Sequence, residues 1–324
     1  IHDTYEMAGP WFPMLATGGE QRLQLPEGSF TIRLRKLSAA RPYGTGWGKW
    51  LAPSILEFAG LRGVDPGLRL HPPALKSRRI AFIGDGLSLG ECVDGSPTAG
   101  SMVAGAVAWQ MQSCEASFPM VLAAALGAEV DIQAMSGIGV VQNAFQHDYP
   151  YLFGSETMHA YWHRRLQSSA DDGRPPKPRP DLVVVNLGDN DFEQPGGRLP
   201  RNITFRTMYK KLLHDVIDVY GGFAKNLTIA AVCGPGVSRD PDTARPAGRC
   251  PACAHVQEAV ENFHDTVEYH TDVSNVRVVF LQLPCDGSVL RTQTDLGCSG
   301  FPNRLGHARI ANILLPQLRT MMSW

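Results

Sequence analysis

The chain has 324 residues and a formal net charge of −1, with 44% hydrophobic and 19% charged residues. The balanced charge argues against a nucleic-acid binder that neutralises phosphates, and the apolar content excludes a disordered chain. No apolar run reaches the roughly 18 residues of a membrane-spanning helix. The length suffices for one large domain or two modest ones, each with a buried core.

The first 77 residues predict a small β-rich module. Residues 30–35 alternate apolar and polar side chains after a Pro-Glu-Gly-Ser turn, as a half-buried strand does. Residues 55–70 add a second strand–turn–strand pattern. We interpret residues 1–77 as a β-sandwich-like (jelly-roll-like) module and its linker, and residues 78–324 as a separate domain.

Residues 78–324 alternate between strand-like and helix-like segments. Apolar, β-rich runs occur at residues 78–86, 129–137, 181–191, 226–235 and 276–284. Helical periodicity occurs at residues 118–127, 204–222 and 254–270, and Asn303 is expected to cap a final helix that Pro316 kinks. Strands linked by helical crossovers predict a five-stranded parallel sheet between helices, whose functional site lies beyond the carboxyl ends of the strands.

The seven cysteines indicate an oxidising compartment. Cys233 lies in an apolar run and is interpreted as a buried thiol. The other six form local pairs, and we expect disulfides between Cys92 and Cys114, Cys250 and Cys253, and Cys285 and Cys298. Two N-glycosylation sequons begin at Asn202 and Asn226. Together they predict a protein of the secretory pathway or the extracellular space.

The Cys250-Pro-Ala-Cys253 segment has the spacing of a redox-active pair. It follows the fourth predicted strand and a long loop, however, whereas a redox motif of this type starts a helix directly after the first strand. Zinc would need two further ligands, and His255 is the one candidate nearby. A structural disulfide is therefore the favoured interpretation, and no metal or cofactor is expected.

Four segments at the predicted strand ends carry the functional signal. They are Gly-Asp-Gly-Leu-Ser-Leu-Gly at 84–90, Ser-Gly-Ile-Gly-Val-Val-Gln-Asn at 136–143, Gly-Asp-Asn-Asp at 188–191, and Gly-Cys-Ser-Gly-Phe-Pro-Asn at 297–303 with Gly-His at 306–307. In order and spacing the set resembles the SGNH (GDSL-type) hydrolases, and within them carbohydrate-esterase family two, which removes acetyl groups from polysaccharides. The resemblance implies a flavodoxin-like SGNH fold behind a small N-terminal β-sandwich.

Two residues depart from the pattern of this family. The nucleophilic serine is expected after Gly-Asp, where this chain has Gly86. The histidine that takes the serine's proton is expected before Pro-Asn, where this chain has Phe301. Glycine carries no hydroxyl and phenylalanine accepts no proton, so both halves of the catalytic dyad are absent.

Two other residues are candidate substitutes for the missing dyad. Ser88 lies two positions after the nucleophile position, and we expect its hydroxyl to point away from the site. His307 lies on the final helix, and we expect it to be a packed or partly exposed histidine. Neither is expected to replace the dyad.

The rest of the family's site is retained. The resemblance assigns the oxyanion hole to the N–H groups of Gly86 and Gly137 and to the side-chain amide of Asn190. Three readings follow. The favoured one is an inactive pseudo-esterase that serves as a structural or interaction subunit with other proteins. The alternatives are a binder of acetylated glycans that does not cleave them, and an active acetyl-esterase with a rearranged dyad.

Overall fold

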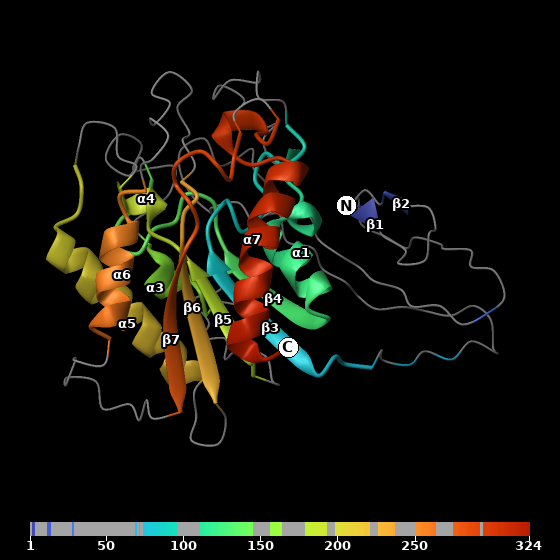
Figure 1. Cartoon of the computed structure of the whole chain (residues 1–324), viewed down its shortest axis with the longest axis horizontal. Coiled ribbons are helices and arrows are strands. Elements are labelled where there is room, and N and C mark those ends of the chain that lie inside the picture. The colour runs from blue at the N-terminus through green and yellow to red at the C-terminus, as the bar shows by residue number, and fades with distance from the viewer. Residues whose placement is uncertain are drawn as a thin grey trace.

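The computed structural model of this chain is shown in Figure 1. The structure describes residues 2–3, 12–13, 28, 69, 71, 74–95, 111–144, 156–163, 179–192, 198–220, 226–236, 250–263, 275–291 and 294–324. None of the helices in this part of the chain is both long and apolar enough to cross a membrane.

A five-stranded parallel sheet forms the centre of the described part of the chain. Its strand order is β4-β3-β5-β6-β7, and all four pairings are parallel. This is the flavodoxin-like order, with the first strand of the sheet second from one edge. The predicted five-stranded sheet is confirmed. The strands are β3 (Arg78–Gly84), β4 (Ala128–Ala134), β5 (Leu182–Asn186), β6 (Leu227–Cys233) and β7 (Val276–Gln282).

Burial on both faces of the sheet explains why the central strand β5 has apolar residues at successive positions. Val183 and Val185 belong to the hydrophobic cluster on one face of the sheet, and Leu182 and Val184 belong to the cluster on the other. All four side chains have no exposed surface. A strand covered on both faces needs apolar side chains pointing both ways, since successive side chains point to opposite faces.

Helices cover both faces of the sheet. Figure 1 shows α7 and α1 on one side of the strands, and α5 and α6 on the other. The 3-10 helices are η4 (Cys114–Ala116) and η6 (Cys298–Gly300). The α-helices are α1 (Phe118–Ala125), α3 (Met158–Tyr161), α4 (Asp189–Phe192), α5 (Asn202–Tyr220), α6 (Cys253–Glu261) and α7 (Arg304–Met322).

The final helix α7 begins as predicted. The side chain of Asn303 accepts hydrogen bonds from the backbone N–H groups of Leu305 (2.9 Å) and Gly306 (3.1 Å), which are two of the donors that a helix start leaves without partners. The helix continues past Pro316 to Met322.

The predicted N-terminal module lies mostly outside the described residues. Within residues 1–77 the structure has two short strands, β1 (His2–Asp3) and β2 (Phe12–Pro13), which pair in antiparallel orientation. The strand expected at residues 30–35 falls outside the described residues. The module and the domain boundary therefore remain predictions.

Candidate functional site

Of the four segments that carry the family resemblance, three follow neighbouring strands of the sheet. Gly84 at the end of β3 is in register with Ala134 at the end of β4 and with Asn186 at the end of β5. The residues that come next, Gly86 and Gly137 among them, therefore leave the sheet at the same edge. This edge is where a parallel α/β sheet places its functional site.

The two residues that depart from the family pattern face each other. A Cβ atom placed on Gly86 would lie 3.2 Å from Cε1 of Phe301. The Phe301 side chain is 3% exposed and packs in the same hydrophobic cluster as Leu87 and Phe118. The two positions therefore lie as close together as a nucleophile and its base would. The residues that occupy them, however, provide neither a hydroxyl nor a proton acceptor.

A carboxylate, Glu91, occupies the space beside Gly86. A Cβ atom on Gly86 would lie 2.1 Å from Oε2 of Glu91, and the same oxygen accepts a hydrogen bond from the hydroxyl of Ser136. The sequence pattern does not indicate that Glu91 lies at the site, because its position depends on the absence of a side chain at Gly86. The available signal was an acidic residue directly after the 84–90 segment.

Of the three residues that the resemblance assigns to an oxyanion hole, Asn190 already has both of its amide hydrogens in hydrogen bonds. The amide nitrogen of Asn190 donates to Oδ2 of Asp85 (2.6 Å) and to the carbonyl of Ile138 (2.8 Å), which accounts for both of its hydrogens. Within the described part of the chain, no backbone carbonyl accepts a hydrogen bond from the N–H groups of Gly86 or Gly137. Two of the three predicted donors therefore have no backbone acceptor within the described part of the chain.

Asp191 holds the loop that follows Gly137. Its carboxylate accepts hydrogen bonds from the backbone N–H groups of Val140 (2.9 Å), Val141 (2.6 Å) and Gln142 (3.0 Å). The side chain is fully buried, and burial raises the pKa of Asp191 to about 6 while the three N–H donors oppose that rise. Asp191 lies in the 188–191 motif, but the sequence pattern alone does not indicate this role.

Ser88 and His307 do not form a replacement dyad. The Ser88 hydroxyl is buried and lies 2.0 Å from where a Cβ of Gly84 would be, so it points toward the end of β3. His307 is fully buried, and its Nδ1 accepts a hydrogen bond from the backbone N–H of Phe118 (3.2 Å). Burial lowers the pKa of His307 to about 3, so the ring is neutral at neutral pH.

The predicted disulfide pairing is wrong. All three expected pairs joined cysteines that are close in sequence, whereas the observed bonds join segments that meet at the carboxyl edge of the sheet. Cys233 is part of a disulfide rather than a buried thiol, and Cys114 takes part in none of the three bonds. None of the bonded sulfurs offers a thiolate to a metal ion. The bonds are Cys92–Cys298, Cys233–Cys253 and Cys250–Cys285.

Two interactions join the Gly86 segment to the Phe301 segment. Cys92 and Cys298 form a disulfide with their Cα atoms 5.0 Å apart. Next to it, the Arg304 guanidinium binds both carboxylate oxygens of Asp94, at 2.6 and 3.1 Å. The facing arrangement of Gly86 and Phe301 is therefore held by a covalent bond and by a bidentate ion pair.

Comparisons with known proteins agree with this architecture. No protein-family model matches the chain. An acetylxylan esterase / glucomannan deacetylase from Cellvibrio japonicus is 25% identical over 267 residues, which are 79% of this chain and 60% of that protein. The matched part thus spans less than two thirds of this relative.

Solved structures share the fold at lower identity. A carbohydrate esterase family two enzyme with a carbohydrate-binding domain, from Corynascus thermopiles (Myceliophthora fergusii), has a TM-score of 0.60 and 24% identity over 79% of this chain and 69% of its own. The family two esterase of Clostridium thermocellum in complex with cellohexaose has a TM-score of 0.55 and 22% identity over 79% of this chain and 67% of its own. The chain therefore has the α/β fold of carbohydrate esterase family two enzymes and a sequence relative that is an acetylxylan esterase.

Proposed function

We propose that this chain is a carbohydrate-esterase-like protein that has lost serine esterase activity and serves as a structural or interaction subunit. The observation that carries the proposal is the contact between Gly86 and Phe301, at the positions where the family resemblance expects nucleophile and base. Acyl transfer by that route needs a hydroxyl and a proton acceptor within hydrogen-bond reach, and this pair supplies neither.

The surroundings of the pair support the same conclusion. The Glu91 carboxylate fills the space next to Gly86, where it would repel an oxyanion. The Asn190 amide, which the resemblance assigns to that oxyanion, donates both hydrogens within the protein. The relative's acetylxylan esterase activity is therefore not expected of this chain.

The test is acetyl-ester hydrolysis by the purified chain and by variants that restore the dyad. Gly86→Ser with Phe301→His supplies both groups, and Glu91→Ala in the same chain makes room, because a Cβ at Gly86 would lie 2.1 Å from the Glu91 carboxylate. We expect no turnover by the natural chain and measurable turnover by the triple variant, on 4-nitrophenyl acetate and on acetylated xylan.

The matched control carries Gly86→Ala in place of Gly86→Ser. It has the same Phe301→His and Glu91→Ala changes and nearly the same side-chain volume at position 86. Because it lacks the hydroxyl, it should not hydrolyse the acetyl ester. Turnover by the natural chain at the rate of the triple variant would contradict the proposal. Equal turnover by the control would show that the hydrolysis does not depend on a serine at this position.

A second candidate function is binding of acetylated glycans without cleavage. The observation in its favour is that the N–H groups of Gly86 and Gly137 have no backbone acceptor among the described residues, and such groups are suited to a carbonyl oxygen. Calorimetric titration with an acetylated xylo-oligosaccharide and with the same oligosaccharide after deacetylation separates this function from the first. Binding of the acetylated form alone supports it, and equal or no binding of the two contradicts it.

The hydrogen bond between Ser136 and Glu91 favours a third candidate, an esterase with a rearranged dyad. A carboxylate can accept a proton from a serine hydroxyl, and the N–H of Gly137, which follows the hydroxyl, could serve as an oxyanion donor. Under this alternative the natural chain turns over acetyl esters and Ser136→Ala abolishes the turnover, while Ser88→Ala leaves it unchanged.

We also propose that the chain matures in the secretory pathway or outside the cell. Three disulfides are typical of an oxidising compartment. Both sequon asparagines, Asn202 and Asn226, are exposed, as glycosylation requires. Glycosidase treatment of protein from a secreting host should lower its mass, and an unchanged mass would remove the support that the sequons give.

A further inference from the structure

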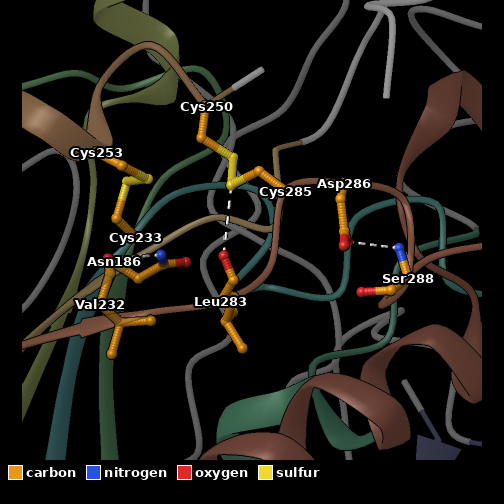
Figure 2. Close-up of a disulfide and its surroundings, with 9 residues drawn as sticks. All are labelled: Asn186, Val232, Cys233, Cys250, Cys253, Leu283, Cys285, Asp286 and Ser288. Carbon is orange, nitrogen blue, oxygen red and sulfur yellow. Dashed lines mark hydrogen bonds between the residues drawn. A yellow bond between two sulfur atoms is a disulfide. The ribbon is translucent and has the colours of Figure 1, made fainter. Parts of the chain in front are cut away.

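Four cysteine sulfurs gather where β6 and β7 end. Cys233 is the last residue of β6, Cys285 follows β7, and Cys250 and Cys253 lie at the start of α6. Figure 2 shows the two bonds side by side, Cys233–Cys253 and Cys250–Cys285. The sulfurs of Cys250, Cys253 and Cys285 all lie within 4.8 Å of one another. A sulfur released from one bond therefore lies next to the other bond.

The two bonds differ in their exposure. Cys233 and Cys253 are 2% and 4% exposed, whereas Cys250 and Cys285 are both partly exposed. A Cβ atom on Gly234 would lie 3.1 Å from the Cys285 sulfur and 3.4 Å from the Cys250 sulfur, so a side chain at this position would contact the outer bond. A reductant should therefore reach Cys250–Cys285 before Cys233–Cys253, because thiol–disulfide exchange requires access to a sulfur.

The local backbone is also suited to a bond between Cys250 and Cys253. The N–H of Cys253 donates to the carbonyl of Cys250 (3.0 Å), which closes a four-residue turn. The end residues of such a turn have Cα atoms less than about 7 Å apart, a range that overlaps the span of a disulfide. The C-x-x-C pair is thus placed at a helix start, directly before the helix predicted from residue 254, and its two cysteines are bonded to different segments.

We propose that these four sulfurs form a thiol–disulfide exchange site whose co-substrate is a dithiol. The dithiol reduces Cys250–Cys285 with two electrons and two protons and becomes a disulfide itself. The Cys250 thiolate then bonds to the Cys253 sulfur while the Cys233–Cys253 bond breaks. The electron pair leaves on Cys233, which takes up the proton that Cys250 lost. The product has a Cys250–Cys253 bond and thiols at Cys233 and Cys285.

The location of the released thiol gives the exchange a defined end point. Cys233 is almost fully buried and belongs to the hydrophobic cluster on the α5 and α6 face of the sheet. A thiol in such surroundings is inert toward external oxidants and metals. The site would therefore accept two electrons at its exposed bond and end with one thiol buried at Cys233 and one partly exposed thiol at Cys285.

The test is partial reduction of the intact chain with limiting dithiothreitol, an acid quench, alkylation in denaturant and mass mapping of each cysteine. We expect label on Cys285 and, in a comparable amount, on Cys233, together with a Cys250–Cys253 disulfide peptide and little label on Cys250. Label on Cys250 and Cys285 alone, with Cys233–Cys253 intact, would overturn the proposal. So would a first product labelled at Cys233 and Cys253, or one that contains a Cys253–Cys285 peptide.

Two controls accompany this experiment. The Cys92–Cys298 bond serves as an internal reference and should remain unlabelled at the same dithiothreitol concentration, because its cysteines are 1% and 0% exposed. The Cys233→Ser/Cys253→Ser variant lacks the inner bond, so its label should appear on Cys250 and Cys285 in equal amounts. The result for the natural chain stands by itself if this variant fails to fold.

Discussion

Replacing Asp191 with asparagine should change how the stability of this chain depends on pH. Burial raises the pKa of Asp191 to about 6, from an ordinary value of 3.8. The folded chain therefore binds this proton more tightly than the unfolded chain does. The stabilisation by Asp191 is complete below about pH 4 and is lost as the pH rises through 6, and the shift corresponds to about 3 kcal/mol.

His307 acts in the opposite direction over the same range. Burial lowers its pKa from an ordinary 6.5 to about 3, so its stabilisation is complete above pH 6.5 and is lost as the pH falls. Between these values the loss is about 1.4 kcal/mol per pH unit. From about pH 6 to pH 4 the contributions of His307 and Asp191 nearly cancel in the natural chain.

In the Asp191→Asn variant, Asp191 should no longer offset the effect of His307 on the pH dependence of the free energy of unfolding. From pH 6 to pH 4 its free energy of unfolding should fall by about 2 kcal/mol more than that of the natural chain, because the stabilisation from protonating Asp191 is missing. An amide also leaves one N–H donor of the 140–142 loop without an acceptor, which lowers stability by about 1–3 kcal/mol at every pH and leaves the slope unchanged.

The assay is urea unfolding with the disulfides intact, followed by tryptophan fluorescence at about pH 4, 5, 6 and 7 and extrapolated to water. Asp218→Asn, which makes the same substitution at an exposed position on α5, is the control. If Asp191→Asn and the natural chain have parallel profiles, the reasoning from burial is refuted.

Three further changes test the packing around the Gly86–Phe301 contact. Phe301→Ala should lower the free energy of unfolding by about 3–5 kcal/mol, because it empties a buried ring position; unchanged stability in urea would mean that the ring does not fill the core. Asn303→Ala should cost about 1 kcal/mol through loss of the α7 cap, and Asn303→Asp should restore most of it; a Tm equal to that of the natural chain would exclude the cap. Replacing both Cys92 and Cys298 with alanine should cost up to about 5 kcal/mol, since the bond closes a loop with a sequence separation of 206; an unchanged urea midpoint would contradict that.

The sheet could be predicted from the sequence because each strand has a local signature. β5 is apolar on successive residues because both of its faces are covered, and α7 begins at Asn303 because a helix start needs a side-chain acceptor. Such signals lie within a few consecutive residues. They do not depend on which other segment packs against them.

The disulfide pairing and the role of Glu91 could not be predicted in this way. Cys250 bonds to Cys285 because the segment before α6 lies next to the end of β7, and this depends on how the strands are ordered in the sheet. Glu91 lies beside Ser136 because Gly86 leaves space there and because β3 and β4 are neighbours. Both features depend on contacts between segments that are distant in sequence.

The Cys92–Cys298 bond has a consequence for the continuity of the chain. It makes one covalent ring of all residues from 92 to 298, a span that contains four of the five strands of the sheet. A protease that cuts once anywhere in this ring opens it but releases no fragment. The nicked protein keeps its full mass on a non-reducing gel and separates into pieces only after the bond is reduced. A single protease cut in a surface loop of this ring therefore leaves the two segments that carry Gly86 and Phe301 covalently joined.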